Sequence, residues 1–412
     1  MNAPWISVIG LGPDGAAGLT ASARDALSVA DHVVCAERHE GLVQDLVAGK
    51  EVHHWPAWHR AKDVIAPLEG QKVAVLGTGE PFHFGVGTSL VRWFGVKALR
   101  VFPATSAFDR ACARLGLAQQ DVDCLSAYGR SLGAVLVRAR VGQTALILGD
   151  GELGPKLKDA LTVMGLGASQ ITALSQMDGA AESRVDAQAK DWSESVDPIT
   201  TWAVTYAADA EANGNWPGLR FEPFGLPDEA FKHDGKITKR EVRSASLSAL
   251  LAAQGGSFWD IGGGSGAIGL EWLRARPSGQ VFTIEPHGER RGFIEKNAKR
   301  FGLGHDERDP FTVSGAHAPD AYQNAPFSPD AVFVGGGLTR EGVLDGAWEA
   351  LNSGGVLVAN AVTLEGQAVL TGWRERVHGD FATLAIARGE SVGRFIGLRP
   401  LMPVLQWVGR KP

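Results

Sequence analysis

The first half of the chain alternates short β-branched apolar runs with longer Ala- and Leu-rich segments. The apolar runs predict strands at Ile6–Leu11, His32–Ala36, Lys72–Gly77, Ala98–Phe102, Thr144–Leu148 and Thr200–Tyr206. The longer segments predict helices at Ala21–Ala30, Thr88–Phe94, Ser106–Leu115 and Leu153–Met164. Strands that alternate with helices in this way are typical of a mainly parallel sheet with helices on its faces.

This pattern stops over Ala207–Asp234, a segment rich in Asn, Gly and Pro. Such residues break regular structure and favour turns. A chain of 412 residues also exceeds the size of about 250–300 residues that one core usually reaches. We therefore predict a first domain at 1–208, a linker at 209–228 with the boundary near Phe221, and a second domain at 229–412.

The second half starts a new α/β alternation. Thr238 and Glu241 have the T-x-x-E spacing of a capping box, which predicts a helix from Lys239 to about Ala253. Further strands are expected at Ser257–Ile261, Gln280–Glu285, Ala331–Val334 and Val356–Asn360, with helices through Trp272 and over Glu289–Phe301. The fold class predicted for both halves is therefore α/β.

Composition narrows the class of protein. The chain is 44% hydrophobic and 21% charged, as in ordinary globular proteins, and its net charge of −6 gives no support for nucleic-acid binding. It has no uninterrupted apolar stretch long enough for a membrane span. The opening MNAPWISVIGLGPDG does not resemble a signal peptide, and three cysteines form no disulfide framework, so we expect a cytoplasmic protein.

The segment FWDIGGGSGAIGLEW carries the strongest chemical signal. It places a glycine loop between a strand and a helix, where a cofactor can lie against backbone without meeting a Cβ. Glu285 ends the next strand, where a carboxylate can accept both ribose hydroxyls of an adenosyl group. Asp260 is expected to hold the loop open by accepting its amides. The predicted S-adenosylmethionine (SAM) contacts here are Asp260, Gly262, Gly263, Gly264, Ser265, Gly266 and Glu285.

A nicotinamide or flavin site is the alternative for this loop. Gly264, Gly266 and Gly269 have the spacing of the dinucleotide fingerprint. Asp260 and the wider loop favour SAM, but the loop alone does not choose the substrate, so a methyltransferase acting on RNA or protein also stays open.

Several segments of the second half resemble the CbiT family. They are DGKITKREVR, FWDIGGGSGAIGLEW, NAKRFGL, DAVFVGGGL and GGVLVANAVTLE, in that order over most of residues 230–400. CbiT proteins methylate and decarboxylate a precorrin with a Rossmann-like class I methyltransferase sheet. The resemblance adds Thr238 and the Gly315–Ala316 turn to the expected SAM pocket, although an acidic residue is common at the position of Ala316.

The first half contains glycine loops of a different kind. VIGLGPDG also matches the dinucleotide fingerprint, but Pro13 and Asp14 interrupt the loop, and the helix is expected to begin only at Thr20. Two further loops follow predicted strands, VLGTGEPFHFG and PATSAFDRACARLGL. In the latter, Thr105 or Ser106 is the expected N-cap of the helix, with Asp109 three residues after Ser106.

Together with LSAYGR, these loops resemble the tetrapyrrole methylase family, and its CbiE branch in particular, over residues 5–206. That family binds SAM between two small α/β lobes. The resemblance implies cofactor contacts from Gly10, Gly12, Pro13, Gly79, Glu80, Pro81, Thr105 and Ser106. Glu80 replaces the usual Asp, and Tyr128 replaces the usual His before Gly129.

Fusion of the two halves resembles the layout of the CobL family. This layout implies one SAM in each domain, a tetrapyrrole substrate, and methyl transfer to carbons 5 and 15 of reduced precorrin-6 with loss of the ring C acetate carboxylate, giving precorrin-8. It also implies a homo-oligomer. The departures at Glu80 and Tyr128 keep a second interpretation open, in which the first half only binds the macrocycle.

The substrate carries many carboxylates, so cations are expected around the mouth of the SAM pocket. Lys236, Lys239, Arg240 and Arg243 are the candidates, although a solvated helix face explains the same cluster equally well. Asn360 and Glu365 follow a late strand and are candidates for orienting the acetate, that is, for a catalytic role.

The segment HHWPAWH raises the question of a metal. His53, His54 and His59 give enough ligands by count, but a surface loop is the preferred interpretation because no carboxylate or Cys joins the set. We therefore predict no metal site.

Overall fold

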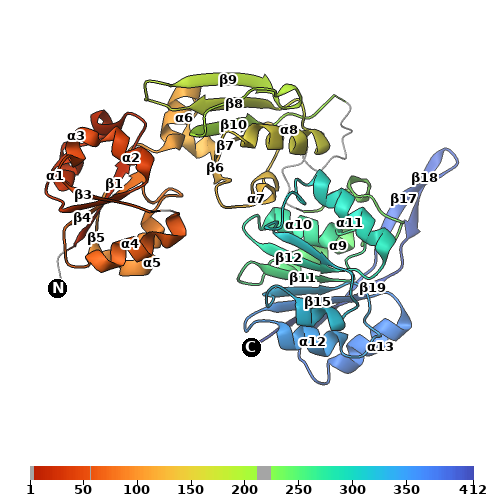
Figure 1. Ribbon diagram of the computed structural model, residues 1–412. Coiled ribbons are helices and arrows are strands. Elements are labelled where there is room, and N and C mark those ends of the chain that lie inside the picture. The colour runs from red at the N-terminus through yellow and green to blue at the C-terminus, as the bar shows by residue number, and fades with distance from the viewer. Residues whose placement is uncertain (1–3, 56, 211–223) are drawn as a thin grey trace. The chain divides into compact units, whose positions relative to one another are not determined.

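The computed structural model describes residues 4–55, 57–210 and 224–412 (Figure 1). It forms two compact units, the first made of residues up to Tyr128, Thr144–Lys156 and Gln170–Thr205. The second contains Gly129–Gln143, Leu157–Ser169 and the described residues from Tyr206 onward. Two segments from before the predicted boundary thus pack with the second unit. Phe221 and most of the predicted linker lie outside the described residues.

The first lobe is built on a parallel five-stranded sheet of order β3-β2-β4-β1-β5. Its strands are β1 (Ile6–Leu11), β2 (His32–Cys35), β3 (Glu51–His54), β4 (Val73–Thr78) and β5 (Leu99–Phe102). The central strands are apolar on both faces because helices cover both sides. The sequence pattern predicted four of these strands and missed the polar edge strand β3.

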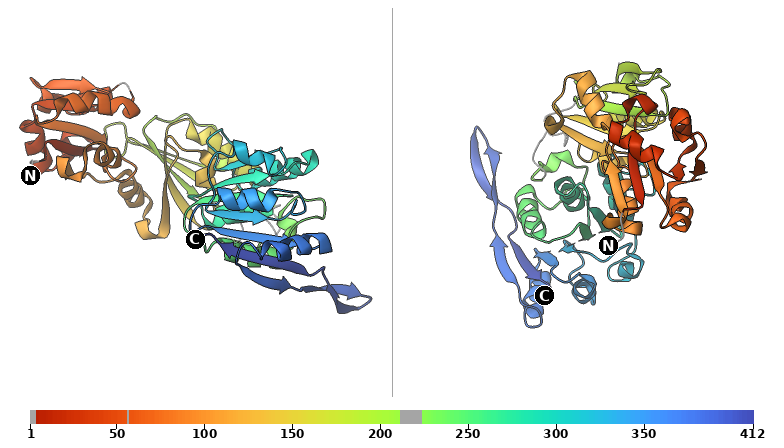
Figure 2. Two further views of the ribbon diagram at one scale, coloured as in Figure 1. Left: turned by 90° about the horizontal axis from the view of Figure 1, so that it is seen from below. Right: turned by 90° about the vertical axis from the view of Figure 1, so that its left-hand side faces the viewer.

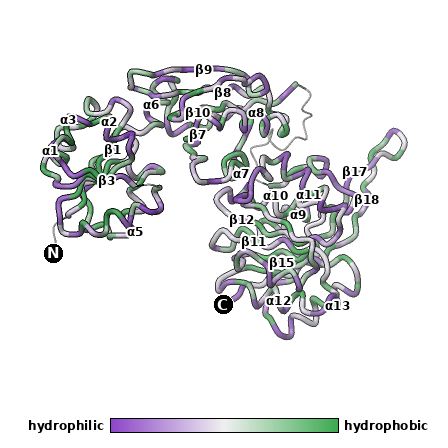
Figure 3. The backbone as a smooth tube through the Cα atoms, in the orientation of Figure 1, coloured by the Kyte–Doolittle hydropathy of each residue, from purple (hydrophilic) through white to green (hydrophobic). Residues whose placement is uncertain are grey.

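Each face of this sheet has its own helices. The residues that pack with α1 (Ala21–Ser28), α2 (Glu37–Leu42) and α3 (Gln44–Val47) include Ile9, Leu27 and Val33. The opposite face packs on α4 (Ala61–Ile65) and α5 (Gly87–Phe94) through Val8, Ile65 and Leu90. The hydropathy colouring in Figure 3 shows green strands inside this lobe, as expected for a sheet buried on both faces.

The second lobe is mixed rather than parallel. Its sheet has the order β6-β7-β10-β8-β9, and only β6 and β7 are parallel neighbours. The strands are β6 (Val122–Ser126), β7 (Thr144–Gly149), β8 (Gln170–Ser175), β9 (Ser183–Gln188) and β10 (Thr200–Thr205). α6 (Ala107–Leu115) packs on this sheet, while α7 (Leu132–Leu136) and most of α8 (Leu153–Val163) belong to the second unit. The prediction of a mainly parallel sheet therefore holds for the first lobe only, and the first half has the expected two lobes.

The last half is built on a seven-stranded sheet of order β13-β12-β11-β14-β15-β19-β16. Its strands are β11 (Ser257–Ile261), β12 (Gln280–Ile284), β13 (Phe311–Ser314), β14 (Ala331–Val334), β15 (Val356–Ala361), β16 (Asp380–Leu384) and β19 (Val404–Arg410). All neighbours pair in parallel except at β19, which is antiparallel to both β15 and β16. This is the expected Rossmann-like methyltransferase sheet.

Helices cover both faces of this sheet, as Figures 1 and 2 show. One face packs on α9 (Arg240–Leu250), α10 (Ala267–Ala275) and α11 (Gly288–Arg300), and the other packs on α12 (Val343–Ala350) and α13 (Leu364–Trp373). A two-stranded ribbon of β17 (Ala387–Val392) and β18 (Phe395–Pro400) extends beyond the sheet (Figure 2). Among the described residues, no helix has the length and apolar character needed to cross a membrane.

The predicted capping box of α9 is wrong. The N-cap residue is Lys239, and no side chain caps the helix. Glu241 instead accepts two hydrogen bonds from the Arg388 guanidinium, at 2.6 and 3.2 Å. Charge-assisted hydrogen bonds of this kind are stronger than a neutral cap, so the distant arginine competes successfully for the carboxylate.

Candidate active sites

The glycine loop of the last half opens a cleft at the carboxyl ends of the parallel strands. Strand order reverses at β11, between β12 and β14, which is where open α/β sheets bind ligands. The cleft has a volume of about 370 Å³. Its lining includes the predicted Thr238, Gly262, Gly263, Gly264, Ser265 and Glu285, together with Lys236, His287, Arg290, His317, Ala318, Gly335, Gly336, Gly337 and Arg340.

Glycines are required in this loop by space and by backbone conformation. Gly262, Gly264 and Gly266 all have positive φ, at +75°, +59° and +78°. A Cβ on Gly263 would lie 2.2 Å from the Thr283 methyl group. The loop therefore presses closely against its neighbours and leaves the cleft floor formed by backbone.

Glu285 is the fixed anion of the cleft. It follows β12, and its side chain is almost fully buried. One carboxylate oxygen accepts the Gly264 amide at 2.8 Å and the other accepts the His287 amide at 3.0 Å. Each carboxylate oxygen can accept more than one hydrogen bond, so acceptor capacity remains for the hydroxyls of a ribose.

Asp260 lies deeper, and its predicted contacts are wrong. It accepts the Gly269 amide of α10 at 3.2 Å, whereas it was expected to accept amides of the loop. Its other oxygen is buried without a hydrogen-bond partner among the described residues. Burial, with a smaller effect from the nearby Glu285, raises the pKa of Asp260 to about 7.

The cations near this cleft differ from those predicted. Lys236 lines it, but Lys239 and Arg240 are not among the lining residues. Arg290 and Arg340, which the sequence argument missed, do line it. They come from α11 and the loop after β14, far from Lys236 in sequence, so no local cluster of basic residues marked them.

Arg243 was predicted near the mouth, and this prediction is wrong. The side chain is fully buried in α9 and bonds to Glu271 at 3.0 Å and Asp228 at 3.1 Å. The guanidinium also lies 5.0 Å from the centre of the Phe231 ring. A charge this buried needs partners inside the protein, and Arg243 has used its donors on them.

The two catalytic candidates lie outside the cleft lining. The Asn360 side-chain amide bonds to Ser246 at 2.9 Å and accepts from Gln406 at 3.0 Å, in a buried polar network. Glu365 is exposed in the first turn of α13. The turn after β13 reaches the cleft through His317 and Ala318, and the predicted Gly315 and Ala316 are not among the lining residues.

The first half has a larger cleft at the carboxyl ends of its own parallel strands, with a volume of about 540 Å³. It receives residues from both lobes. The lining includes the predicted Gly79, Glu80 and Ser106, together with Arg38, His39, Trp55, Trp58, Thr78, His83, Phe84, Phe108, Tyr128, Leu148, Ile199, Thr200 and Thr201.

A smaller cavity of about 180 Å³ adjoins this cleft, because both share Arg38, His39, Thr78 and Ile199. The predicted Gly12 and Pro13 line it. Gly10 is buried beneath, where a Cβ would lie 2.3 Å from the Gly79 carbonyl oxygen. Gly10 therefore allows the first and second glycine loops to meet.

The remaining predicted contacts of this half have local partners. Ser106 forms the predicted capping box with Asp109 at the start of α6. The Glu80 carboxylate accepts the Phe82 amide at 2.7 Å and so holds its own loop. The carbonyl groups of Thr105 and Pro81 accept from Arg110 and the Gly87 amide, and neither residue is among the lining residues of the two cavities.

Two family models match the chain. One covers the half that contains the first cleft, and the other covers the half that contains the second. The precorrin methyltransferase domain matches residues 229–411, and the Tetrapyrrole (Corrin/Porphyrin) Methylases match residues 6–171. A Sinorhizobium protein named precorrin-6Y C(5,15)-methyltransferase [decarboxylating] is 41% identical over 98% of this chain and 96% of its own length. A protein of the same name from Mycobacterium tuberculosis is 35% identical over 98% of each chain.

The chain belongs to this precorrin methyltransferase family. Methyltransferases of the family use SAM. Among solved structures, the C-terminal domain of precorrin-6Y C5,15-methyltransferase from Rhodobacter capsulatus is 41% identical, with a TM-score of 0.41, over 45% of this chain and 97% of its own.

Arg38 and His39 line the first-half cleft, although the sequence did not predict them as site residues. Both bond to the Thr78 hydroxyl, at 2.7 and 2.8 Å. Burial and the neighbouring Arg38 lower the pKa of His39 to about 4, so its imidazole is neutral at pH 7. The available signal was a run of charged residues directly after the end of a parallel strand.

The interpretation of HHWPAWH also changes. His53 and His54 lie in the edge strand β3, and His59 lies in the short 3-10 helix Trp58–Arg60. The premise that no carboxylate joins the histidines is wrong, because Glu51 contacts His53 and His54 contacts Glu40. Trp55 and Trp58, the tryptophans of this segment, line the first-half cleft, so the segment is not the surface loop that was predicted.

Proposed function

We propose that this chain methylates reduced precorrin-6 at carbons 5 and 15 and removes the ring C acetate carboxylate as carbon dioxide, giving precorrin-8. One SAM binds in each half. The last half carries the carbon-15 methylation and the decarboxylation, and the first half carries the carbon-5 methylation. The observation that carries the proposal is Glu285, a buried carboxylate fixed by two amides at the edge of a glycine-floored cleft.

The residues of the last-half cleft fit an adenosyl cofactor. Glu285 accepts the ribose hydroxyls, and the loop from Gly262 to Gly266 allows close approach to backbone. SAM supplies an electrophilic methyl group when bound. The protein has to hold the ring carbon in line with that methyl group and keep water out, so few catalytic side chains are needed.

Decarboxylation in this cleft needs little from side chains. The bond between the acetate methylene and its carboxylate carbon breaks, and the electron pair passes into the conjugated ring, which then takes up a proton. Lys236, Arg290 and Arg340 are the cations at the cleft for the other carboxylates of the substrate, and Arg290 and Arg340 would exchange their partners Asp234 and Asp320 for them. They hold the ring while the reacting acetate occupies the less polar part of the cleft.

The first-half cleft fits a flat conjugated ring. Trp55, Trp58, Phe84 and Tyr128 give it an aromatic wall, and aromatic faces stack on such rings. Arg38 places a cation among them for a propionate or acetate side chain. Gly12 and Pro13 in the adjoining cavity, with Gly79 and Glu80, are the proposed SAM contacts.

The test is the mass of the product that purified chain forms from reduced precorrin-6 and SAM. Addition of two methyl groups with loss of one carbon dioxide is the expected result. With Glu285→Ala, the expected product has one added methyl group and retains every carboxylate. If the wild-type chain binds SAM and leaves precorrin-6 unchanged, the substrate assignment is wrong.

A second function for the first half has one observation in its favour. The Glu80 carboxylate accepts a hydrogen bond from the backbone amide of Phe82, in the same loop. In this alternative the first half binds the macrocycle without methylating it. The wild-type product would then carry one new methyl group, and its mass separates the two cases.

The ribbon of β17 and β18 supports the proposal of a homo-oligomer. Phe395, Ile396 and Leu398 are 65–78% exposed on it. A two-stranded ribbon is marginally stable alone, and exposed apolar patches mark association sites. We propose that a second copy of the chain covers this ribbon. Light scattering should show an oligomer for wild type and smaller species for Phe395→Ser combined with Ile396→Ser.

We also propose a cytoplasmic location. Cys35, Cys112 and Cys124 are all free, and burial raises the pKa of Cys35 to about 11, which keeps it protonated. Unpaired thiols suit a reducing compartment.

A further inference from the structure

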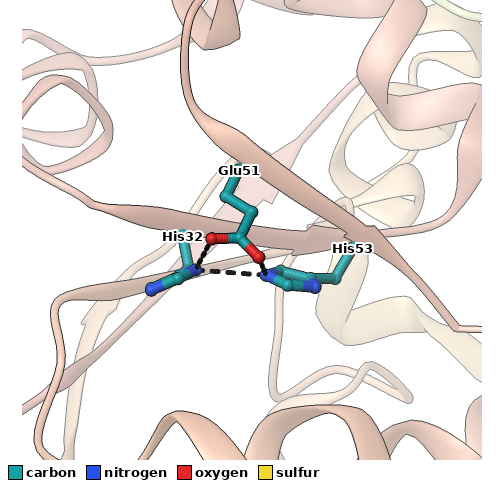
Figure 4. A group of neighbouring side chains, drawn as sticks. All are labelled: His32, Glu51 and His53. Atoms are coloured by element: carbon teal, nitrogen blue, oxygen red, sulfur yellow. Dashed lines mark hydrogen bonds and ion pairs between the residues drawn. The ribbon is translucent and has the colours of Figure 1, made fainter.

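Two imidazoles and a carboxylate meet in the first lobe at its edge strand β3, and none of the three side chains is among the lining residues of the two cavities. They are His32 Nδ1, His53 Nε2 and the two oxygens of Glu51 (Figure 4). We propose that these three side chains bind one zinc ion. The proposal concerns a site separate from the two methyltransferase clefts and does not depend on the proposed function.

The parallel register of β2 and β3 explains why these residues meet. His32 is the Cα partner of Glu51, and Val34 is the partner of His53. Side chains two residues apart in a strand share a face, so Glu51 and His53 both point to the side where His32 lies. His54 points to the other face of the same strand and pairs with Glu40 at 2.8 Å.

The distances between the three side chains match a tetrahedral zinc site. His32 Nδ1 lies 3.1 Å from His53 Nε2 and 3.4 Å from one Glu51 oxygen, and His53 Nε2 lies 3.6 Å from the other. Ligands about 2.0–2.2 Å from zinc in a tetrahedron lie about 3.3–3.6 Å from one another. Two imidazole nitrogens and a carboxylate are donors that zinc takes, whereas magnesium and calcium prefer oxygen ligands alone.

A neighbouring amide sets the tautomer that metal binding needs. His32 Nε2 bonds to the side-chain oxygen of Gln71. An amide oxygen only accepts, so Nε2 carries the hydrogen and the neutral ring turns the lone pair of Nδ1 toward Glu51 and His53. Metal-bound histidines are held in the same way, through the nitrogen that does not bind the metal.

The lone pairs need a cation between them. In the tautomer with its hydrogen on Nε2, His32 Nδ1 cannot donate, so within these three described side chains only His53 Nε2 can supply a hydrogen. This hydrogen can form a good hydrogen bond to His32 Nδ1 or to a Glu51 oxygen, but not to both. A zinc ion replaces that hydrogen and attracts all the ligands at once. Glu51 is largely exposed, which leaves room for water as the fourth ligand.

The position of the site indicates a structural role. His32 is level with Val73 in β4, and the cleft residue Thr78 lies five residues further along that strand. Trp55, two residues after His53, also lines the cleft, but none of the three proposed ligands does, so the metal would support the sheet from outside the cleft lining. Zinc at this place would join the edge strand β3, which pairs only with β2 among the described strands, to the rest of the sheet.

The experiment uses the full chain, freed of metal with a chelator and titrated with Zn²⁺ against a chromophoric competitor. One zinc per chain is expected. Cobalt in its place should give the intense visible bands of a tetrahedral site rather than the weak bands of an octahedral one. His53→Gln and Glu51→Gln each remove one ligand from a partly exposed position, and each should weaken zinc binding by at least about 100-fold.

His54→Gln is the matched control, because it changes the next histidine of the same strand on the opposite face. It should bind zinc as wild type does. Gln71→Leu should weaken binding by about 10–100-fold, as loss of an orienting partner does. Zinc should raise Tm for wild type and His54→Gln but not for His53→Gln.

Two results would overturn the proposal. One is a metal-free wild-type chain that takes up no zinc at micromolar concentration. The other is zinc binding that Glu51→Gln and His53→Gln leave unchanged, which would place the metal elsewhere. Circular dichroism of each variant, compared with wild type, separates loss of a ligand from loss of the fold.

Discussion

The two clefts lie at equivalent places in their sheets and have different walls. Both open at the carboxyl ends of parallel strands, and both use glycines where loops meet. The last-half cleft holds a fixed carboxylate, Glu285, and three long cations among its lining residues. The first-half cleft is lined by aromatic rings, and Arg38 is the only Lys or Arg of its lining residues. Backbone topology thus places a site, while the residues after each strand decide what chemistry it can bind.

The strongest test of this contrast is Glu285→Ala. Loss of the carboxylate removes the acceptor for the ribose hydroxyls, so SAM affinity in the last-half cleft should fall by about 100-fold or more, as for a lost charged hydrogen-bond pair. Carbon-15 methylation and decarboxylation should stop while carbon-5 methylation continues. Calorimetry of SAM binding and product mass measure both effects.

Glu289→Gln is the control for that variant, since Glu289 is exposed in the first turn of α11. It should behave as wild type. If Glu285→Ala stopped both methylations equally, the two clefts would not be independent sites.

Buried arginines offer a second comparison. Arg243→Met leaves Glu271 buried without its cation, and the free energy of unfolding should fall by about 3–5 kcal/mol. In the first half, Arg110→Met should cost less, because its partner Asp178 is partly exposed and keeps Arg114 at 2.5 Å. Urea unfolding followed by circular dichroism measures both, and equal losses would contradict the comparison.

The close approach of the two glycine loops in the first half gives the third test. Gly10→Ala places a Cβ against the Gly79 carbonyl, so the loops must separate, at a cost of about 1–3 kcal/mol. Carbon-5 methylation should fall at least tenfold, and the last-half reactions should be unchanged. Gly41→Ala, in α2 with open space around it, is the matched control.

The fourth test concerns Asp260, whose effect depends on pH and vanishes in acid. Its raised pKa, about 7 against an ordinary value of 3.8, means that the folded chain binds a proton which the unfolded chain has released. The contribution of this group to stability is therefore present below about pH 4 and is lost as pH rises through about 7. Asp260→Asn stays neutral, so it should be more stable than wild type by about 4 kcal/mol at pH 8, at about 1.4 kcal/mol per pKa unit, and no more stable at pH 4. Thermal unfolding of both proteins from pH 4 to pH 8 measures the difference. If Tm changed equally with pH in the variant and in wild type, the prediction would be wrong.

Local pattern predicted most of the central parallel strands, but it missed the buried antiparallel strands β8 and β19. The glycine loop, Glu285 and the order of elements around them could all be found from sequence, because spacing along one strand-loop-helix unit determines them. β3 and β9 were missed because edge strands carry polar residues on exposed faces and lose the apolar signal.

Contacts between distant segments could not be predicted. Arg243 looked like its neighbours Lys239 and Arg240 until the fold placed Glu271 and Asp228 beside it. The pairing of Glu241 with Arg388 and the group formed by His32 and His53 have the same origin. In each case the decisive partner lies many residues away, and only the register of packed elements brings it close.

The position of β19 has a consequence for how the chain emerges from the ribosome. It lies between β15 and β16, and it pairs in the antiparallel direction with both. β16 is therefore synthesised before the strand that connects it to the sheet. The residues of β16 therefore have no strand partner in the sheet until translation has passed Arg410, the last residue of β19. The apolar ribbon of β17 and β18 is synthesised during the same interval. By then the first half has long had all its strands, so the two halves mature at different times, and the last one is the more exposed to proteases and chaperones during synthesis.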